Sequence, residues 1–512
     1  MKSLLPVTDN SSRTAPLEMS ADSFRQHGYF LVDKIAVLFD SLGEKPVTTG
    51  KQPAAIRSIL GDASLPLTGS SLDEIFNNAV ELLSENSLYN GSPRFWGYIT
   101  GAPAPAAVLA DLLASAVNAN VGANILSPMA TEIELQCIKW IAELIGFKND
   151  CGGIFVSGGN MANITGLLTA RKAKANWDIR QSGLNDKGML IYCSKSTHTW
   201  VSKAADLLGF GTDSIRWIET NEQDQMDVLL LERQVQFDLL EGYRPFVVVG
   251  TAGAVSTGAV DPLDKIAAVC TKYSLWFHVD GAYGAPAVIV PEVTHLFNGM
   301  ELADSVALDP HKWLYSPLEA GCLLVKNKQA LHDTYSFHPA YYNFDGPEDD
   351  RSINFHEFGF QNSRGFRALK VWILLQQAGK NGYRKMINDD IKLAKKLFTM
   401  ANSHRELQAI SCNLSIVTFR FIPDNYISFD PTAYLNRLNE EIVNRTQAGG
   451  EVFVSNALVD GRYCLRACIV NFRTQASDIE TLVNVVVRTG RAVRREWQEK
   501  AFKHNNSDKP TY

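Results

Sequence analysis

The sequence predicts an α/β protein: a mainly parallel sheet, a helical extension before it and a smaller α+β domain after it. Between about residues 93 and 377, short β-rich runs alternate with helical runs, the pattern of a parallel sheet covered on both faces. After Lys380 a long charged helix and further strands follow. The 512 residues are 46% hydrophobic, enough for a large core shared by two or three domains. We expect domains at 1–90, 91–385 and 386–512.

The first 90 residues are expected to form a helical extension. The run "SADSFRQHGYFLVDKIAVLFDSL" repeats apolar residues at spacings of three and four, which indicates an amphipathic helix. Ser20 or Asp22 is the candidate N-cap. The polar end of the chain, "KHNNSDKPTY", is expected to be a disordered tail.

The central region reads as strand, helix, strand. "GGIFVSGG" precedes "MANITGLLTARKAKA", "GMLIYCS" precedes "TWVSKAADLLG", "FVVVGT" precedes "DPLDKIAAVCTKY", and "LWFHVD" follows. Asp261 before Pro262 is interpreted as a helix N-cap with a purely structural role. Beyond the helix "GYRKMINDDIKLAKKLFTMANS", the strands "LSIVTFRFIP" and "YCLRACIVNF" flank another helix, which predicts the small α+β domain.

Composition excludes several classes of protein. A net charge of -6 argues against nucleic-acid binding, and the basic run at Arg491, Arg494 and Arg495 is interpreted as a solvated helix face. The opening apolar run is too short for a signal peptide, and nowhere do 18 apolar residues follow one another, so we expect neither export nor a membrane span. Eight cysteines without a C-x-x-C pair fit a reducing cytoplasm.

Ligands of open α/β sheets bind beyond the carboxyl ends of the strands, and four candidate sites follow apolar runs there. In "SGGNMAN", Gly159 lies in a turn before a helix that Asn160 can cap, which would make a pocket for one phosphate. Such Gly-Gly turns also occur for structural reasons alone. His198 follows "GMLIYCS", although a lone histidine is more often a cap or a surface residue.

The third and fourth sites carry charge. Asp280 ends the apolar run "WFHVD" and needs a cationic partner there. Lys312 follows His311 in "ADSVALDPHKWLYSP", and a desolvated lysine has a free amine that can condense with a carbonyl. A snorkelling surface lysine is the alternative for Lys312 alone. One ligand would satisfy all four sites together if it had a phosphate, a flat ring, a cationic ring nitrogen and an aldehyde. Pyridoxal phosphate has each of these groups.

With these residues in place, "HVDGAYG" and "DPHKW" resemble the cofactor signature of the group II pyridoxal-phosphate-dependent decarboxylases, which include aromatic-L-amino-acid, glutamate and histidine decarboxylases. The similarity extends from about Ser92 to Arg473 and includes "PRFWGYITG", "ANILSPMATEIE" and "RGFRALKVW". It implies the pyridoxal-phosphate-dependent transferase fold of type I, with a sheet of the seven-stranded type. It also implies an obligate homodimer with shared active sites, to which the N-terminal extension contributes.

The resemblance implies a role for each matching residue. Lys312 would bind the cofactor covalently, Asp280 would keep the pyridine nitrogen protonated, and His198 and Ala282 would pack on the two faces of the ring. The phosphate side would comprise Gly159, Asn160, Asp309 and His311, and Ser363 would complete the phosphate site of the second subunit.

A tyrosine of a mobile lid returns the proton to the α-carbon in the resembling decarboxylases. The polar segment "SFHPAYYNFDGPEDD" is expected to be that lid, and Tyr341 falls at the matching position, with Tyr342 as the adjacent rival. Relatives with phenylalanine at this position tend toward aldehyde formation, so a tyrosine favours the amine.

The chain departs from the family pattern in four places. Asp309 stands where several relatives have asparagine, and Asn160 replaces a common serine. Ala254 and Val255 replace threonines near the cofactor, so a hydroxyl there is missing or comes from Ser256 or Thr257. The positions that grip an aromatic substrate are matched by small or polar residues, which would make the substrate pocket either wider or more polar: Gly101, Asn120 and Gly122.

The expected activity is therefore pyridoxal-phosphate-dependent decarboxylation of a small-molecule L-amino acid to the amine and carbon dioxide, with an aromatic amino acid as one candidate substrate. Acidic or other polar amino acids stay open as substrates. An aminotransferase or a carbon–carbon lyase acting on an amino acid is the alternative within the same cofactor chemistry. No metal is expected.

Overall fold

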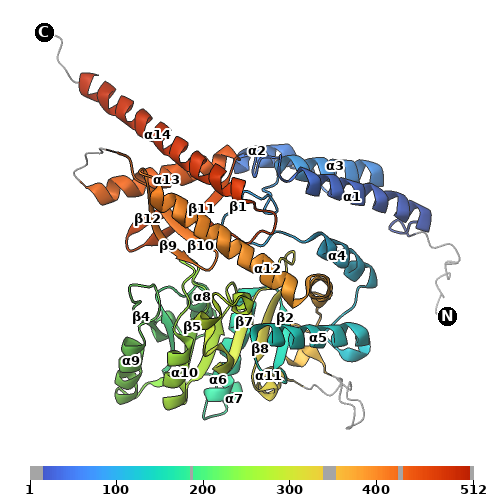
Figure 1. Ribbon diagram of the computed structural model, residues 1–512. Coiled ribbons are helices and arrows are strands. Elements are labelled where there is room, and N and C mark those ends of the chain that lie inside the picture. The colour runs from blue at the N-terminus through green and yellow to red at the C-terminus, as the bar shows by residue number, and fades with distance from the viewer. Residues whose placement is uncertain (1–14, 185–187, 338–352, 425–429, 508–512) are drawn as a thin grey trace, which may run out of the picture. The chain divides into compact units, whose positions relative to one another are not determined.

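The computed structural model describes residues 15–184, 188–337, 353–424 and 430–507 (Figure 1). The chain divides into two compact units, Met1–Lys45 with Thr49–Leu88, and Pro46–Thr48 with Tyr89–Tyr512. Within the described part of the chain, every helix is too short or too polar to serve as a membrane span.

The first unit is helical, as predicted. It contains α1 (Ala21–Ser41), α2 (Pro53–Leu60) and α3 (Leu72–Asn86), and α1 packs on α3. Ser20 is the N-cap of α1, because its hydroxyl accepts a hydrogen bond from the backbone N–H of Ser23 at 3.1 Å. The predicted helical extension and one of its two candidate caps are thus confirmed.

A seven-stranded sheet forms the centre of the second unit. Its order is β2-β8-β7-β6-β5-β3-β4; β8 pairs antiparallel with both β2 and β7, and the other neighbouring pairs are parallel. The predicted mainly parallel sheet is therefore confirmed. The strands are β2 (Gly152–Val156), β3 (Met189–Ser194), β4 (Ile215–Ile218), β5 (Arg244–Thr251), β6 (Trp276–Asp280), β7 (Ser305–Leu308) and β8 (Gly321–Val325).

Helices cover this sheet because strands that are buried on both faces need an apolar partner on each side. The helix α6 packs along β5 to β8, while α9 and α10 pack along β4 to β6 (Figure 1). The helices around the sheet are α4 (Pro105–Val117), α5 (Pro128–Ile145), α6 (Gly159–Lys174), α7 (Ile179–Ser182), α8 (Trp200–Leu207), α9 (Val228–Leu240), α10 (Leu263–Lys272) and α11 (Lys328–Tyr335).

A second sheet of five strands has the order β1-β11-β12-β10-β9. Its strand β1 (Phe95–Trp96) comes from a distant part of the sequence and pairs in parallel with β11, while the other pairs are antiparallel. Helices α12, α13 and α14 pack on it. The remaining elements are α12 (Ala368–Ser403), β9 (Leu407–Asn413), β10 (Ile416–Phe421), α13 (Pro431–Gly449), β11 (Phe453–Val459), β12 (Arg462–Cys468) and α14 (Ala476–Ser507).

Three local expectations differ from the structure. Residues 503–507, expected to belong to a disordered tail, lie in the last helix, Ala476–Ser507. The long helix begins at Ala368 rather than after Lys380, and it is broken at Gly379, whose φ of 59° is accessible to glycine. Asp261 is not a helix cap. It is buried, and its two oxygens accept backbone N–H groups of Met226 at 2.7 Å and Thr251 at 2.8 Å. The boundary predicted at 385/386 lies inside α12, and the division into 91–385 and 386–512 stays a prediction.

Candidate active site

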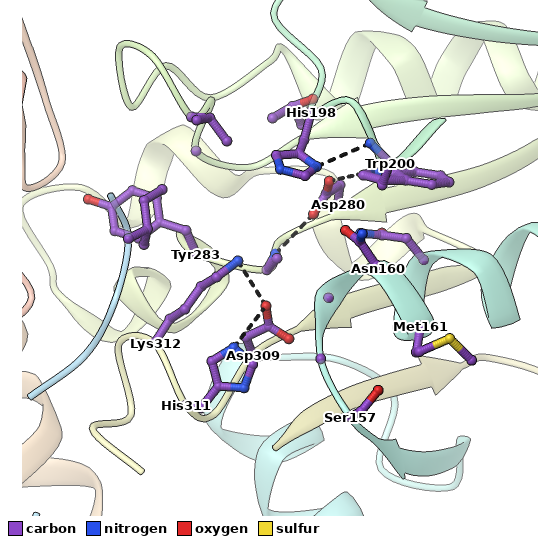
Figure 2. A pocket seen from close by; sticks show the side chains of 18 of the residues that line it. Ser157, Asn160, Met161, His198, Trp200, Asp280, Tyr283, Asp309, His311 and Lys312 are labelled. Atoms are coloured by element: carbon purple, nitrogen blue, oxygen red, sulfur yellow. Dashed lines mark hydrogen bonds and ion pairs between the residues drawn. The ribbon is translucent and has the colours of Figure 1, made fainter. Parts of the chain in front are cut away.

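A cavity of about 330 Å³ opens at the carboxyl edge of the seven-stranded sheet, where polar side chains follow β2, β3, β6 and β7 (Figure 2). Eight predicted site residues line it: Gly159, Asn160, His198, Asp280, Ala282, Asp309, His311 and Lys312. Ser363 is exposed and is not among the lining residues. Tyr341 and Tyr342 lie outside the described residues.

Lys312 forms an ion pair with Asp309. Its Nζ lies 2.8 Å from Oδ2 of Asp309, and the carboxylate is almost completely buried. Burial lowers the pKa of Lys312, but the charge and hydrogen bond of Asp309, with a smaller effect of Asp280, together raise it above its ordinary value. The expected free amine is therefore not favoured by desolvation at this site, because the pairing with Asp309 favours the ammonium form of Lys312.

His311 adjoins the same carboxylate. Its Nε2 lies 3.7 Å from Oδ2 of Asp309, and its Nδ1 accepts a hydrogen bond from the backbone N–H of Ala320 at 3.1 Å. Burial lowers the pKa of His311, although Asp309 opposes this shift. The imidazole therefore tends to be neutral, and the main cationic partner of Asp309 is Lys312. Oδ1 of Asp309 has no hydrogen-bond partner among the described residues.

Asp280 ends β6 and has a different donor on each oxygen. The indole Nε1–H of Trp200 donates to Oδ2 at 2.7 Å, and the backbone N–H of Ala282 donates to Oδ1 at 3.2 Å (Figure 2). Behind it, His278 is fully buried between Ser305 and Asn163, and burial lowers its pKa to about 4. His278 is therefore neutral near pH 7 and does not compensate the charge of Asp280.

His198 lies between β3 and α8. Its Nδ1 accepts a hydrogen bond from the backbone N–H of Trp200 at 3.2 Å, so in the neutral imidazole the proton sits on Nε2. Burial lowers the pKa of His198, and the Lys312 ammonium lowers it further against the opposing effect of Asp280. A neutral, oriented imidazole can stack on a flat ring.

The amino end of α6 forms the wall nearest Asp309. Gly158 is the N-cap and has no side chain to satisfy the first N–H groups, so these are available to an anion. Asn160 lies in the first turn and is not the cap that the sequence suggested. A Cβ on Gly159 would lie 2.6 Å from Oδ2 of Asp309, so only glycine fits at this position.

The positions expected to shape the substrate pocket do not line this cavity. Gly101 and Gly122 are small because added Cβ atoms would collide with the backbone oxygens of Lys312 and Asn362. Asn120 braces the backbone by accepting the N–H of Gly122 at 3.1 Å. Gly101 and Gly122 therefore allow close approach of chain segments, and the part of all three residues in a substrate pocket stays a prediction.

Trp200 and Thr251 are among the lining residues that sequence reasoning missed. Trp200 follows His198 by two positions, and an indole at a strand's carboxyl end was the available signal. Thr251 supplies a hydroxyl to the wall and pairs with the hydroxyl of Thr197 at 3.2 Å, whereas Ser256 and Thr257 are not lining residues.

Comparison with known proteins agrees with this geometry. Residues 53–422 match the model of the pyridoxal-dependent decarboxylase conserved domain. The chain belongs to the pyridoxal-dependent decarboxylase family. An aromatic-L-amino-acid decarboxylase of Bacillus atrophaeus is 34% identical over 90% of this chain and 94% of its own, and a tyrosine decarboxylase of Petroselinum crispum is 29% identical over 91% and 93%. A crystal structure of Oryza sativa TDC with PLP and tryptamine superposes with a TM-score of 0.86 at 26% identity, covering 94% of this chain and 100% of that one.

This decarboxylase is a carboxy-lyase that uses pyridoxal 5'-phosphate, and the cavity has the donor set that the cofactor requires. It combines a lysine amine for the aldehyde, a carboxylate for the ring nitrogen, an imidazole for the ring face and an uncapped helix end for the phosphate. The residues present therefore fit this group.

Proposed function

We propose that this decarboxylase acts on an aromatic L-amino acid and releases carbon dioxide and the corresponding amine. The observation that carries the chemistry is the convergence of Lys312, Asp280 and His198 on one cavity. The names of its relatives, among them decarboxylases of tyrosine and tryptophan, support the aromatic side chain. Ile99, Val255 and Tyr283 in the wall offer apolar surface for such a ring.

Each residue has one proposed task. Lys312 would hold the cofactor through its Nζ, Asp280 would face the ring nitrogen, and His198 and Ala282 would lie on the two ring faces. Gly159 and Asn160 would bind the phosphate through backbone N–H groups, with Asp309 and His311 beside it. When bound, the cofactor supplies an electron sink for the pair left on the α-carbon as carbon dioxide departs.

Which bond to the α-carbon breaks depends on how the substrate is oriented, since the bond perpendicular to the cofactor ring is the one that is weakened. The rigid walls at His198 and Ala282 would keep the ring in one plane. The apolar side of the cavity would then set the orientation of the substrate side chain. Decarboxylation rather than transamination would thus follow from positioning.

Tyr341 is proposed to return a proton to the α-carbon, with Tyr342 as the alternative donor. A relative named phenylacetaldehyde synthase, from a Rosa hybrid cultivar, is 27% identical over 93% of this chain and 95% of its own. Tyr341→Phe should lower the yield of amine and raise that of aldehyde, measured by chromatography of the products. An unchanged amine-to-aldehyde ratio would assign the proton to another group.

We also propose a cytoplasmic homodimer with shared active sites. All eight cysteines are free, as in a reducing compartment. The helix α4 exposes an apolar face that water would not stabilise and a second copy could cover: Leu109, Leu112, Leu113 and Val117.

Ser363 would complete the phosphate site of the second subunit. It is exposed, yet its neighbour Arg364 is buried and is bonded to Glu134 at 2.5 Å and to the backbone oxygens of Val121 and Phe155. These bonds restrain the backbone next to Ser363 at the surface. A residue that completes the phosphate site of a second subunit needs such a defined position.

The decisive experiment measures carbon dioxide and keto-acid release from a panel of aromatic, acidic and aliphatic L-amino acids. Carbon dioxide from tyrosine, tryptophan or phenylalanine, without keto acid, is the expected result. Release only from glutamate or aspartate would overturn the substrate class, and keto-acid formation would indicate an aminotransferase. Borohydride treatment of the loaded protein should attach the cofactor to Lys312, as mass spectrometry of the peptide would show.

A further inference from the structure

We infer that Trp200 is a positioning residue that fixes Asp280 and His198 for the cofactor ring, and that its indole N–H sets the strength of cofactor binding. This inference rests on the roles proposed above for Asp280 and His198. Trp200 thereby joins the residues proposed to hold the cofactor, although it neither touches the reacting carbon nor carries a charge. Figure 2 shows Trp200 beside both side chains.

Trp200 makes two hydrogen bonds, one through its side chain and one through its backbone. Its indole Nε1–H donates to Oδ2 of Asp280 at 2.7 Å, and its backbone N–H donates to Nδ1 of His198 at 3.2 Å. Only 1% of Trp200 is exposed, and it begins α8, so its position is set by the packing of that helix. The indole thus orients the group assigned to the ring nitrogen, and the backbone N–H of the same position orients the group assigned to the ring face.

The bond to Asp280 fixes the plane of its carboxylate. Oδ1 is already held by the backbone N–H of Ala282, at 3.2 Å. With Oδ2 held by Trp200, neither oxygen can rotate away without breaking a buried hydrogen bond, which costs more than a bond exchanged with water. Asp280 is therefore aligned before the ring nitrogen arrives.

The neutrality of this donor is as important as its position. The titratable groups that face Asp280 are Lys312, His198, His278 and, beyond Lys312, Asp309. Lys312 is already paired with Asp309, and His278 is neutral with both ring nitrogens hydrogen-bonded. The indole stabilises the anion without neutralising it, so the full negative charge stays available to a protonated ring nitrogen.

A double-mutant cycle tests this coupling. The dissociation constant of pyridoxal phosphate is measured by absorbance titration of the cofactor-free protein for Trp200→Phe, Asp280→Asn and the double variant. Trp200→Phe should weaken binding about tenfold to a hundredfold, the range for a hydrogen bond to a charged group. In the Asp280→Asn background the same change should have little further effect, because the charge is gone.

Trp96→Phe is the matched control. Trp96 is also fully buried and donates its indole N–H, to Thr474 at 3.2 Å, but it lies in the five-stranded sheet. It should leave the dissociation constant unchanged in both backgrounds. Thermal unfolding of the cofactor-free variants checks that each is folded. If Trp200→Phe does not fold, Trp200→His takes its place. This variant retains a ring N–H and should bind the cofactor within a few-fold of wild type.

The pH profile of cofactor binding gives a second readout that a packing defect would not change. Loss of the indole donor destabilises the ionised carboxylate, so the acid limb of binding should move to higher pH in Trp200→Phe and not in Trp96→Phe. Equal weakening by Trp200→Phe in the wild-type and Asp280→Asn backgrounds, or an unmoved acid limb, would overturn the inference. Unchanged binding in Asp280→Asn itself would instead contradict the proposed role of Asp280.

Discussion

At the scale of single residues, Asp309 has the most unusual environment in the site. It is a buried carboxylate with one oxygen paired to Lys312 and the other without a partner among the described residues. The phosphate is proposed to bind next to it, and two neighbouring anions repel each other. Asp309 is therefore expected to oppose cofactor capture in two ways, by favouring the ammonium form of Lys312 and by repelling the phosphate.

Asp309→Asn should accelerate cofactor capture. Without the carboxylate the pKa of Lys312 falls. Each unit by which this pKa decreases raises the fraction of free amine at pH 7 by roughly tenfold. The rate of the absorbance change on mixing cofactor-free protein with pyridoxal phosphate, followed from pH 6 to 9, measures this. Asp304→Asn, at the other end of β7, is the control and should leave the rate unchanged. A slower capture by Asp309→Asn would show that the carboxylate assists the reaction.

Gly101→Ala should damage the site rather than alter substrate choice. Its Cβ would collide with the carbonyl oxygen of Lys312, so the lysine segment must move. We expect a loss of about 1–3 kcal/mol in the free energy of unfolding, typical of overpacking, together with weaker cofactor binding. Denaturant titration and cofactor titration measure the two effects. Gly28→Ala, whose Cβ meets open space in α1, is the control and should not destabilise the protein. A stable Gly101→Ala variant with altered substrate preference would instead show that Gly101 shapes the substrate pocket.

At the scale of elements, α12 anchors the segment that follows Lys312. Oδ2 of Asp390 accepts the indole N–H of Trp313 at 2.9 Å and the hydroxyl of Tyr315 at 2.8 Å, and the hydroxyl of Tyr383 donates to the backbone oxygen of Leu314 at 3.1 Å. Burial raises the pKa of Asp390 to about 7, although the two side-chain donors oppose the shift. The lysine is thus held by a helix whose key carboxyl group titrates near neutrality.

Asp390→Asn should flatten the pH dependence of stability. Between about pH 4 and pH 7 the folded protein retains a proton on Asp390 that the unfolded chain releases, so the free energy of unfolding falls as pH rises across this window. Asparagine cannot ionise, and part of the fall should disappear. Asp261, whose pKa burial raises to about 6, is expected to account for much of the remainder. Denaturation midpoints from pH 4.5 to 7.5 provide the measurement.

Asp389→Asn is the matched control for Asp390. Asp389 is nearly half exposed and pairs with Lys385 at 2.7 Å, so its loss should leave the pH slope as it is in the wild type. If Asp390→Asn also kept the wild-type slope, the titration would belong to other groups.

Elements with a clear local period could be predicted from the sequence, and those defined by distant partners could not. The strand ending at Asp280 and the helix after Gly158 were predictable because an apolar run meets a turn there. The two-residue strand β1 has no period and exists only because β11 lies beside it. The break in α12 at Gly379 could not be predicted either, because an isolated glycine in a helical pattern is usually tolerated.

The candidate site shows the same division. Gly159, Asn160, His198, Asp280 and Lys312 were predicted because a parallel sheet brings the carboxyl ends of its strands to one edge. The resemblance to the decarboxylase family added Ala282, Asp309 and His311. The raised pKa of Lys312 and the contact of Trp200 with Asp280 were not predicted, because both depend on where side-chain atoms point. The close backbone contacts of Gly101 and Gly122 were not predicted either, because they leave no local signal in the sequence.

At the scale of the whole molecule, shared active sites can be tested by mixing two inactive subunits. Lys312→Ala removes the proposed covalent anchor, and Ser363→Glu places a negative charge where the partner's phosphate would bind. Each variant alone should be inactive. Co-expressed, they should form hybrid dimers with one intact site, so roughly a quarter of the wild-type sites are recovered. Carbon dioxide release measures the recovery, and light scattering gives the mass. A monomer, or hybrids without activity, would contradict shared sites.

The pairing of β1 with β11 also bears on the order in which the chain can fold during synthesis. The last strand of the seven-stranded sheet ends at Val325, so that sheet can be completed while the ribosome is still translating the rest. Phe95 and Trp96, by contrast, leave the ribosome early. Their strand has no partner until Phe453 and Val454 have been synthesised. Pairing across so long a stretch of chain is slow. The five-stranded sheet is therefore expected to close last, after the residues that line the cofactor cavity have been made.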